Sequence, residues 1–248
     1  MTDLDIVILA AGKGTRMKKD LPKVLVEVKG RPMLEYALGE TKKISKTPLV
    51  VLGYMAELVK EKIKGHDRFC LQEKQLGTGH AVREALKYVD PRAKTLIVLY
   101  GDHPLVTVDT VKKLYDSHKA QIKSPVTLAT VKLPDFSDWR APFFDFGRIV
   151  RAKDGSIERI VEKKDSNETE ITITEVSPSF FCFSLDWLKE NINKLNTNNA
   201  QGEFYLTDII QIAQKQNHKI NSVTIEAIEA LGVNTAEQLA LVEGLMSK

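Results

Sequence analysis

Short apolar runs alternate with stretches of helical periodicity through the first half of this 248-residue sequence. The apolar runs, rich in Val, Ile and Leu, lie at residues 4–10, 24–28, 49–53 and 95–100. The helical patterns lie at residues 32–45, 55–64, 78–88 and 108–120. Strands that alternate with helices form units in which consecutive strands run parallel and the helices cover the faces of the sheet. We therefore predict an α/β fold with a mostly parallel central sheet flanked by helices.

The pattern changes after Ser124. Strand-like runs with few helices between them follow at residues 126–133, 147–152, 156–163 and 171–184. The tripeptide Asp-Gly-Ser at 154–156 joins two of these runs and favours a hairpin turn. A helix is then expected at residues 204–217, a strand at 220–225 and an amphipathic helix at 235–246. This half is predicted to form a smaller mixed or antiparallel extension laid against the parallel sheet.

No internal repeat and no low-complexity linker divides the sequence. The polar segment at residues 164–170 is too short to separate two domains. We therefore predict a single domain, residues 1–248. It has one lobe at 1–124, a second at 125–234 and a C-terminal helix at 235–248.

The composition excludes several classes of protein. Apolar residues make up 43% of the chain and charged residues 28%, a balance typical of globular proteins. The net charge of +3 is interspersed rather than gathered in a basic stripe, so no nucleic-acid partner is expected. No run has the length of a membrane span and no N-terminal signal is present, so we expect a cytoplasmic protein without a membrane partner. Cys70 and Cys182 lie inside apolar runs and are predicted to be buried small hydrophobic residues rather than metal ligands.

The segment LAAGKGTRM at residues 9–17 begins at the end of the first apolar run. It does not match the P-loop, because Lys13 is followed by Gly14 rather than by Ser or Thr. It does not match the dinucleotide-binding pattern either, because Met17 stands where the third glycine belongs. What remains is a glycine turn that carries Lys13 and Arg16. It either binds an anion through backbone N–H groups and these cations or is a tight turn with solvent-facing side chains.

Lys23 in LPKVL favours anion binding, because the preceding proline places this cation rigidly at the start of a predicted strand. Together, LAAGKGTRM and LPKVL resemble the opening of sugar nucleotidyltransferases. Further segments follow in the order found in N-acetylglucosamine-1-phosphate uridyltransferases, the N-terminal domains of the bifunctional enzymes that make UDP-N-acetylglucosamine. These segments are LQEKQLGTGHA (71–81), LYGDHPLV (99–106), FGRIVR (146–151), IVEKKD (160–165), NNAQGEFYLTDII (198–210) and LGVN (231–234).

This resemblance spans nearly the whole chain and implies an activity and a fold. Members of this family transfer UMP from UTP to N-acetylglucosamine 1-phosphate and release pyrophosphate, with Mg²⁺ as cofactor, and so serve cell-wall synthesis. The implied fold is Rossmann-like, the nucleotide-diphospho-sugar transferase fold. Residues 1–124 would then form the nucleotide-binding lobe and residues 125–234 the sugar-binding lobe. The attacking sugar phosphate has a second pKa of about 6, so no general base is needed at neutral pH.

The resemblance also implies roles for individual residues. The nucleotide base and ribose are expected at Leu9, Ala10, Ala11, Gly12, Gln72, Gly77 and Thr78. The catalytic residues implied are Lys13, Arg16, Lys23 and Asp102. The sugar is expected at Tyr100, Gly101, Gly147, Glu162, Ser177 and Asn234. By the same resemblance, Gly77 permits close approach of the base. Without it, Gln72 is simply a polar residue at a strand end, and Glu162 is a strand residue paired with Lys163 or Lys164.

Asp102 is the strongest candidate for a metal ligand. It stands just past the apolar run TLIVLY, at the edge where open α/β sheets bind ligands, and Mg²⁺ prefers oxygen ligands. A helix-capping role is the alternative, weakened because Asp109 is better placed to start the next helix. The resemblance makes Asn234 the second protein ligand, although an Asn before Thr235 is also typical of a helix start. We assign no role to His103, because the reaction needs no histidine.

The chain departs from the family pattern near the expected sugar site. Where the family has Asn-Thr-Gly, this chain has Ser177-Pro178-Ser179, which replaces an amide with a shorter hydroxyl. The segment at 134–149 is longer than usual. It brings Trp139, Phe143, Phe144 and Phe146 toward the sugar, where they either stack on it or cover the edge of the sheet. These differences leave the identity of the sugar more open than that of the nucleotide.

The sequence ends at Lys248 without the hexapeptide repeats of an acetyltransferase domain. Acetyltransferase activity is therefore not expected, and a monomer or a weak homo-oligomer is. Two alternatives to the implied activity remain. One is uridylyl transfer to a different sugar 1-phosphate, and the other is binding of a nucleotide sugar without turnover.

Overall fold

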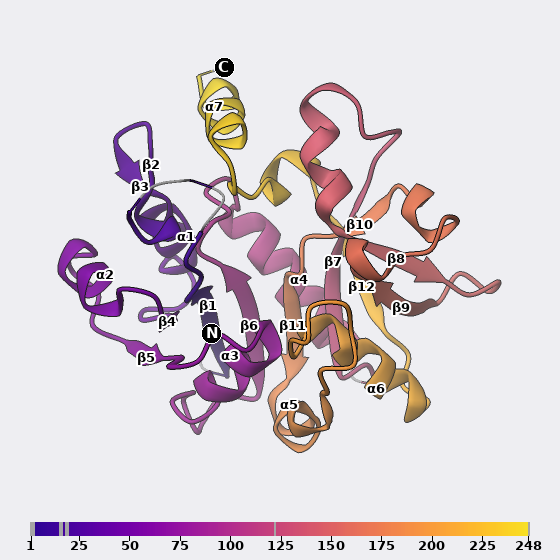
Figure 1. The fold of residues 1–248 in the computed structure, drawn as a ribbon. Helices are drawn as coiled ribbons and strands as arrows, with labels where there is room; N and C mark the ends of the chain where they lie inside the picture. The colour runs from indigo at the N-terminus through magenta and orange to yellow at the C-terminus, as the bar shows by residue number, and fades with distance from the viewer. Residues whose placement is uncertain (1–2, 15–16, 18–19, 122, 248) are drawn as a thin grey trace.

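The computed structural model describes residues 3–14, 17, 20–121 and 123–247. Within them, ten strands form one sheet in the order β5-β4-β1-β6-β11-β7-β10-β8-β9, with β12 paired to β7 (Figure 1). The part of the sheet from the first half of the chain is parallel, and the part from the second half is mostly antiparallel. The predicted α/β class with a central sheet flanked by helices is confirmed.

The parallel part of the sheet consists mainly of strands that are buried on both faces. It consists of β1 (Leu4–Ala10), β4 (Leu49–Leu52), β5 (Phe69–Leu71) and β6 (Thr95–Tyr100). The helices that follow these strands or connect them are α1 (Met33–Thr41), α2 (Ala56–Lys62), α3 (Thr78–Ala85) and α4 (Val108–Ala120). Along β1, Ile6 and Ile8 enter the core that includes α1 and α4, whereas Val7 and Leu9 enter the core that includes α3. A strand covered on both faces has no polar side, which explains the continuous apolar runs in the sequence.

The second half of the chain continues the same sheet. β11 (Phe181–Ser184) pairs antiparallel with β6 on one side and with β7 (Val126–Lys132) on the other. Beyond β7 lie β10 (Glu175–Ser177), β8 (Gly147–Arg151) and β9 (Ile157–Val161), each antiparallel to its neighbour, while β12 (Asn221–Thr224) runs parallel to β7. The extension is therefore mixed, as predicted. It joins the parallel part edge to edge through β6 and β11 instead of lying against it.

Two expected strands differ in the structure. In the run at 24–28, residues Lys23–Leu25 form a 3-10 turn, and only β2 (Glu27–Val28) pairs, with β3 (Arg31–Pro32). The run looked strand-like because it is rich in valine, but the three consecutive side chains of Val24, Leu25 and Val26 are all buried in the core that includes α1. The run at 171–184 is split into β10 and β11. Between them, Pro178 has no N–H to donate and Ser179 has a left-handed φ of +60°.

Several elements were absent from the sequence prediction or are shorter than predicted. Helix α5 (Leu185–Asn191) and strand β5 were not expected, and the helix expected at 204–217 is a 3-10 turn followed by α6 (Ile209–Lys215). That turn is Leu206–Asp208, and the further 3-10 helices of the described residues are Asp138–Asp145, Lys163–Asp165, Glu170–Thr172, Ile192–Lys194 and Ala227–Ala230. These short turns escape detection because their few residues carry no periodic pattern.

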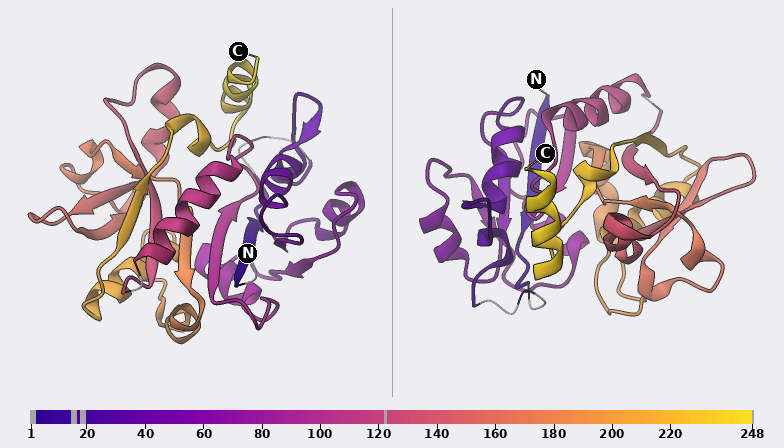
Figure 2. Two further views of the ribbon diagram at one scale, coloured as in Figure 1. Left: turned by 180° about the vertical axis from the view of Figure 1, so that it is seen from behind. Right: turned by 90° about the horizontal axis from the view of Figure 1, so that it is seen from above.

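The C-terminal helix returns to the first half of the molecule. Helix α7 (Ala236–Leu245) lies beside the β2–β3 hairpin, and the backbone N–H of Lys29 donates to Glu243 at 3.0 Å (Figure 2). Thr235 caps its N-terminus, since the Thr235 hydroxyl accepts the N–H of Gln238 at 3.3 Å. Only Val242 of this helix is fully buried. The helix therefore fixes the segment before it rather than building a core of its own.

Both cysteines are free and buried, as the sequence predicted. Burial raises the pKa of the Cys70 thiol to about 12, and that of Cys182 well above its ordinary value. Neither is therefore a thiolate at neutral pH. None of the helices in the described part of the chain combines the length and the apolar character that crossing a membrane requires.

Candidate active site

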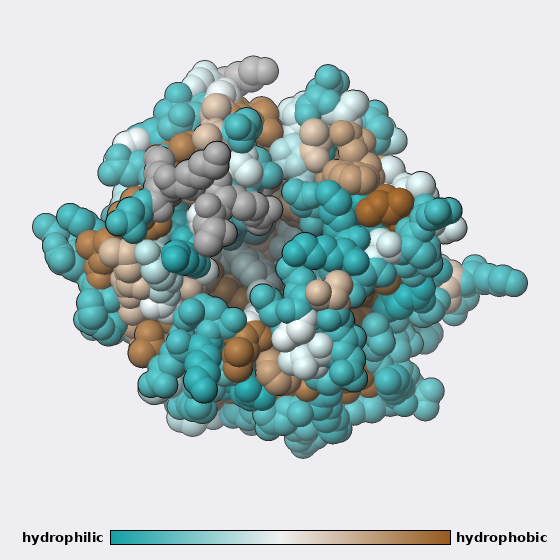
Figure 3. Space-filling view, viewed as in Figure 1, coloured by the Kyte–Doolittle hydropathy of each residue, from teal (hydrophilic) through white to brown (hydrophobic). Residues whose placement is uncertain are grey.

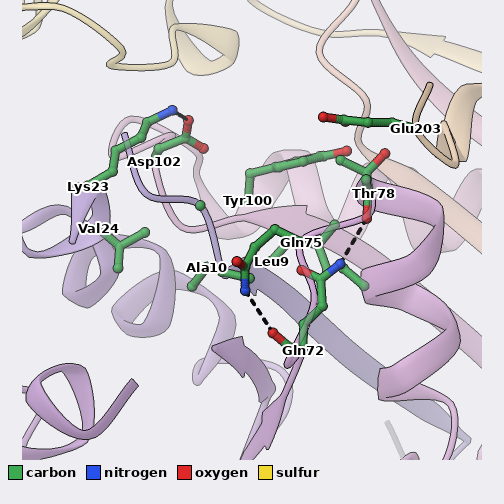
Figure 4. Close-up of a pocket in the computed structure, with 14 residues that line it drawn as sticks. Leu9, Ala10, Lys23, Val24, Gln72, Gln75, Thr78, Tyr100, Asp102 and Glu203 are labelled. Carbon is green, nitrogen blue, oxygen red and sulfur yellow. Dashed lines mark hydrogen bonds and ion pairs between the residues drawn. The ribbon is translucent and has the colours of Figure 1, made fainter. Parts of the chain in front are cut away.

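A cavity of about 260 Å³ lies at the carboxyl ends of β1 and β6 (Figure 4). It is lined by Leu9, Ala10, Ala11, Gly12, Lys23, Val24, Gln72, Gln75, Gly77, Thr78, Ala81, Tyr100, Asp102 and Glu203. The face viewed in Figure 1 is hollowed near its middle (Figure 3). All seven residues that the sequence predicted to contact a nucleotide base and ribose line this first cavity, together with Lys23 and Asp102. Ligands of open α/β sheets bind at this edge.

Only glycine fits at position 77, just before α3, because of its backbone conformation and the close approach of the Phe204 segment. Its φ is +106°, and an added Cβ would lie 2.6 Å from the carbonyl oxygen of Phe204. The two segments are joined there, because the N–H of Gly79 donates to that oxygen at 2.8 Å. The sequence suggested that Gly77 admits a ligand. The structure adds that any larger residue would also push the Phe204 segment away from α3.

Gln72 follows β5 and is held firmly in the wall of the first cavity. Its side chain is buried, and its amide nitrogen donates to the carbonyl oxygen of Gly77 at 3.0 Å and lies 3.0 Å from Nδ1 of His80. The side-chain amide of Gln75 donates to the backbone oxygen of Gln72 at 2.9 Å. Gln72 is thus at a strand end, as its plainer interpretation had it, but its amide is fixed in orientation rather than turned to solvent.

A second cavity, of about 250 Å³, adjoins the first. The two share Thr78, Tyr100, Asp102 and Glu203. The other residues that line the second are His103, Asp145, Phe146, Gly147, Glu162, Ser177, Pro178, Ser179, Gln201, Tyr205, Thr207, Gly232 and Asn234. Five of the six residues predicted to contact a sugar lie on this wall. The sixth, Gly101, is packed behind it against Leu34 and Val24.

Asp102, Lys23 and Asn234 meet where the two cavities join. The ammonium group of Lys23 forms a salt bridge with Oδ2 of Asp102 and donates to Oδ1 of Asn234 at 2.5 Å (Figure 4 shows Lys23 and Asp102 pointing toward each other). Burial alone would raise the pKa of Asp102. The neighbouring Lys23 and His103, through charge and hydrogen bonds, outweigh burial and hold this pKa well below its usual range. The carboxyl group is therefore ionised.

The oxygens of Asp102 and Asn234 suit a hard divalent cation. Both contact the same ammonium nitrogen, so they converge on one point where a positive group already lies. Carboxylate and amide oxygens are ligands that Mg²⁺ accepts, and this ion often takes only one or two carboxylates and completes its shell with phosphates and water. In the part of the chain that the structure describes, no group of three or more His, Cys, Asp or Glu side chains is arranged to hold a metal. The donor set fits a metal shared with a substrate.

His103 contacts Asp102, although the sequence analysis gave it no role. Its Nδ1 lies 3.1 Å from Oδ1 of Asp102, the oxygen that does not face Lys23. Its ring packs edge-on against Phe180, with centroids 5.0 Å apart, and an added Cβ at Gly232 would lie 3.0 Å from its Nε2. The ring is thus fixed on both sides. The only sequence signal for this contact was its position next to Asp102.

Glu162 is not paired with its neighbouring lysines. Its Oε1 accepts a hydrogen bond from the hydroxyl of Thr207 at 2.9 Å, while Lys163 pairs with Asp145 at 2.6 Å and Lys164 donates to an amide oxygen. The plainer interpretation as a salt-bridged strand residue is wrong. Burial raises the pKa of Glu162, and the hydrogen bond from Thr207 partly opposes this. A partly buried carboxylate with spare acceptor capacity therefore faces the second cavity.

The Ser177-Pro178-Ser179 segment has an internal hydrogen bond. The hydroxyl of Ser177 accepts the backbone N–H of Ser179 at 3.0 Å, and Ser177 is 3% exposed. Ser179 adopts a φ of +60°, which a residue with a Cβ rarely does. The segment therefore forms a sharp, fixed corner of the second cavity.

Three other predictions have different outcomes. Lys13 lines neither cavity, and its ammonium lies 5.1 Å from the centroid of the Tyr54 ring. Arg16 lies outside the described residues. The cap of α4 is Thr107, whose hydroxyl accepts the N–H of Thr110, so the expectation that Asp109 starts this helix is wrong. A capping role for Asp102 is excluded all the same, because Thr107 fills it.

Sequence reasoning missed part of both walls. Glu203 belongs to both cavities, and Gln201, Tyr205 and Thr207 belong to the second, yet the motif at 198–210 had been recognised without assigning any site residue to it. The available signal was its cluster of polar residues around the adjacent aromatic residues Phe204 and Tyr205. Of the four aromatic residues that the sequence placed near the sugar, Trp139, Phe143, Phe144 and Phe146, only Phe146 lines the second cavity.

Comparisons of the sequence with known proteins all match nucleotidyltransferases or their domains. Residues 6–144 match the family model described as "MobA-like NTP transferase domain". The bifunctional protein GlmU of Clostridium acetobutylicum is 41% identical over 245 residues, which is 98% of this chain and 52% of that protein. The GlmU of Streptococcus uberis is 42% identical over 245 residues, with the same shares of each. The chain therefore spans about half the length of the curated relatives it matches.

Solved structures show the same fold at low identity. A UDP-glucose pyrophosphorylase complexed with UDP-glucose superposes with a TM-score of 0.74 at 16% identity, over 100% of this chain and 99% of that one. A CMP:2-keto-3-deoxy-manno-octonic acid synthetase complexed with CTP gives 0.69 at 17% identity, over 99% and 98%. The predicted nucleotide-diphospho-sugar transferase fold is confirmed.

Proposed function

Because this chain belongs to the family of MobA-like NTP transferase domains, we propose that it transfers UMP from UTP to N-acetylglucosamine 1-phosphate. The products are UDP-N-acetylglucosamine and pyrophosphate. The observation that carries the proposal is the pair of adjoining cavities that meet at Asp102, since two polyanions that react with each other need neighbouring sites. The choice of uridine and of the acetylated sugar is supported by the ordered motifs that resemble uridyltransferases and by relatives at 41% and 42% identity.

The reaction needs electrostatic help more than proton transfer. A phosphate oxygen of the sugar 1-phosphate attacks the α-phosphorus of UTP and forms a new P–O bond. The bond between that phosphorus and the bridging oxygen breaks, and pyrophosphate leaves with the electron pair. The attacking phosphate is largely dianionic at neutral pH because its second pKa is about 6, so it requires no base. Repulsion between the two substrates is the obstacle, and preorganised positive charge offsets it.

We assign the first cavity to UTP. The backbone at residues 9–12 would hold the base and ribose, and Gln72, Gly77 and Thr78 would read the uracil edge. The fixed amide of Gln72 supports this, because an amide already held in one orientation discriminates between bases without an entropy cost on binding. Lys23 is assigned to the phosphates, together with Lys13 and Arg16 from the glycine turn.

We assign Mg²⁺ to the oxygens of Asp102 and Asn234. When bound there, the ion would supply positive charge beside the reacting phosphates. The ionised state of Asp102 supports the assignment, because a metal ligand must be deprotonated. His103 would keep the Asp102 carboxylate in one orientation through its contact with Oδ1.

We assign the second cavity to the sugar 1-phosphate. Tyr100, Gly147, Glu162, Ser177 and Asn234 would surround the sugar, with Gly101 behind them, and Glu162 would accept hydrogen bonds from its hydroxyl groups. We further propose that residues 1–124 are the nucleotide-binding lobe and residues 125–234 the sugar-binding lobe of one domain that ends in the helix at 235–248. The enzyme would act in the cytoplasm, as a monomer or weak homo-oligomer, in the synthesis of UDP-N-acetylglucosamine for the cell wall.

The deciding experiment measures pyrophosphate release by the purified chain with UTP, Mg²⁺ and N-acetylglucosamine 1-phosphate. Glucose 1-phosphate and dTTP serve as controls, and omission of the metal tests the cofactor. Release with UTP and the acetylated sugar alone is the expected result. Release with a different sugar would move the substrate, in line with the serine at position 177. If no pair of substrates gave pyrophosphate and the chain bound UDP-N-acetylglucosamine tightly, the protein would be a nucleotide-sugar-binding protein rather than an enzyme.

A further inference from the structure

Arg148 is a buried cation whose partners are carbonyl groups. It follows Gly147 in β8 and is 0% exposed, and none of the carboxylates in the described ranges forms a salt bridge with it. Its guanidinium donates instead to backbone oxygens. Nη2 donates to Phe144 at 2.9 Å, Nη1 donates to Phe146, and Nε donates to Ile171 at 3.3 Å. The planar fork of an arginine is suited to binding several carbonyl groups at fixed angles.

Two aromatic rings complete the surroundings of this guanidinium. Its central carbon lies 5.0 Å from the ring centroid of Phe136 and 5.1 Å from that of Phe144. Cation–π contacts compensate part of the cost of burying a charge. Burial lowers the pKa of Arg148, while the charges of Asp145 and Glu162 oppose this. A buried ion is expensive compared with an apolar side chain of similar volume, so its presence calls for a reason beyond packing.

Two of the three carbonyl groups that Arg148 binds, those of Phe144 and Phe146, belong to the segment that forms one wall of the second cavity, whereas Ile171 does not line it. The bound oxygens of Phe144 and Phe146 flank Asp145, and Asp145, Phe146 and Gly147 all line that cavity. The outer side of the same wall is held by Lys163, which pairs with Asp145 at 2.6 Å and lies 4.4 Å from the centroid of the Phe144 ring. No residue of this 144–147 segment lines the first cavity. The hydrogen bonds from Arg148 therefore affect the second cavity and not the first.

We propose that Arg148 is a positioning residue for the sugar 1-phosphate, which holds residues 144–147 in the shape that this substrate contacts. This inference rests on the proposed function and deepens it, because it names a residue outside the second cavity that fixes the wall contacted by the sugar and so influences which sugar is accepted. It also gives the longer 134–149 segment a use. Phe136 and Phe144 do not stack on the sugar but enclose the cation that fixes the wall.

The test compares Arg148→Lys and Arg148→Met in steady-state kinetics of the full chain with UTP and N-acetylglucosamine 1-phosphate. Lysine keeps the charge but has no fork, and methionine keeps the length without the charge. Both are expected to raise KM for the sugar 1-phosphate by about tenfold or more, the scale of losing hydrogen bonds from a charged donor, and to leave KM for UTP within about twofold. If neither variant folds, Phe144→Leu removes one ring and leaves the guanidinium in place. It is expected to give the same split with a smaller rise.

Arg151→Lys is the matched control. Arg151 lies on the same strand but pairs with Glu175 at 2.7 Å and lines neither cavity. It is expected to lower the melting temperature without changing either KM. Equal rises in both KM values for the Arg148 variants, unchanged KM values, or the same split in Arg151→Lys would each overturn the proposal.

The proposed function and this inference fail in different ways. A wild-type chain that releases no pyrophosphate but binds UDP-N-acetylglucosamine contradicts the proposed enzymatic activity. The effect of the Arg148 variants is then measured by comparing the dissociation constant of UDP-N-acetylglucosamine with that of UTP. The Arg148 variants would weaken binding of the nucleotide sugar and not of UTP. Wild-type protein that binds neither compound overturns both proposals.

Discussion

The two cavities share a boundary but are built in different ways. Most of the first lies at the carboxyl ends of β1, β5 and β6 and at the start of α3, so the sheet itself places it. The second cavity is lined by residues of 3-10 turns and strand ends and by Ser179, whose φ is left-handed. These residues come from widely separated parts of the chain, between residue 78 and residue 234. The difference teaches that the first wall depends on local backbone geometry, whereas the second depends on side chains packed behind it. The predictions below test that contrast.

The largest effect is expected at the boundary, where a change affects both sites at once. Asp102→Asn removes the negative charge between the cavities, and Lys23→Ala removes its cationic partner. Each is expected to lower turnover about a hundredfold or more, the scale of losing one preorganised charge. The measurement is pyrophosphate release at saturating Mg²⁺. Asp109→Asn, in the first turn of α4, serves as control, and near wild-type rates in either boundary variant would remove that residue from the mechanism.

A change in the first wall is expected to act through the backbone. Gly77→Ala combines a φ of +106° with a contact of 2.6 Å to the Phe204 oxygen, so the start of α3 must shift. We expect KM for UTP to rise about tenfold and the protein to lose about 2 kcal/mol of unfolding free energy. Gly155→Ala is the matched control, because its φ is +82° but nothing lies within 4 Å of the added Cβ. Equal effects of the two alanines on KM would show that strain alone, and not the contact, determines the site.

His103 tests whether a side chain behind Asp102 influences catalysis. His103→Leu removes the contact with Oδ1 of Asp102, whereas His103→Asn retains an N–H donor close to the position of Nδ1. We expect the leucine variant to lose about five- to tenfold in kcat, the upper end of the scale of an ordinary hydrogen bond. The asparagine variant should recover most of this loss. Equal rates in both variants would assign the ring to packing against Phe180 alone.

The smallest effect is expected outside both cavities, at Asp208. Burial, followed by the charge of Asp165, raises the pKa of Asp208 to about 6. The native state therefore holds a proton that the unfolded chain releases, and stability falls as the pH rises from about 4 to 6. Asp208→Asn is expected to match the wild type near pH 4 and to be more stable by about 1 kcal/mol at pH 7, a value discounted because the side chain is partly exposed.

Urea unfolding at the two pH values measures this difference, and activity is not expected to change. Asp154→Asn is a control with the opposite sign. Hydrogen bonds from Ser156 lower the pKa of Asp154, so its replacement should cost stability at neutral pH. A stability difference for Asp208→Asn that is the same at both pH values would contradict the raised pKa.

The sequence predicted the first cavity better than the second. Leu9 and Ala10 end β1, Ala11 and Gly12 follow it, and Asp102 lies just past β6, so a strand assignment was enough to place them at one edge. The interpretation of Glu162 as a residue paired with Lys163 or Lys164 was wrong, because residues adjacent in sequence can point to different partners. The Glu162 carboxylate accepts a hydrogen bond from Thr207 instead. Lys23 was expected to enter a strand but begins a 3-10 turn. The sequence predicted no role for Arg148, because no sequence pattern shows that backbone carbonyl oxygens are its partners.

The sequence by itself determined the parallel sheet and the edge at which the first cavity opens, since apolar periodicity and glycine turns are properties of short segments. Only the tertiary structure decided that Asn234 meets Lys23, 211 positions away, and that Arg148 is enclosed by carbonyl oxygens and two rings. Such contacts depend on how whole elements pack against one another. Packing is the sum of many small interactions between distant segments, and no single stretch of sequence records it.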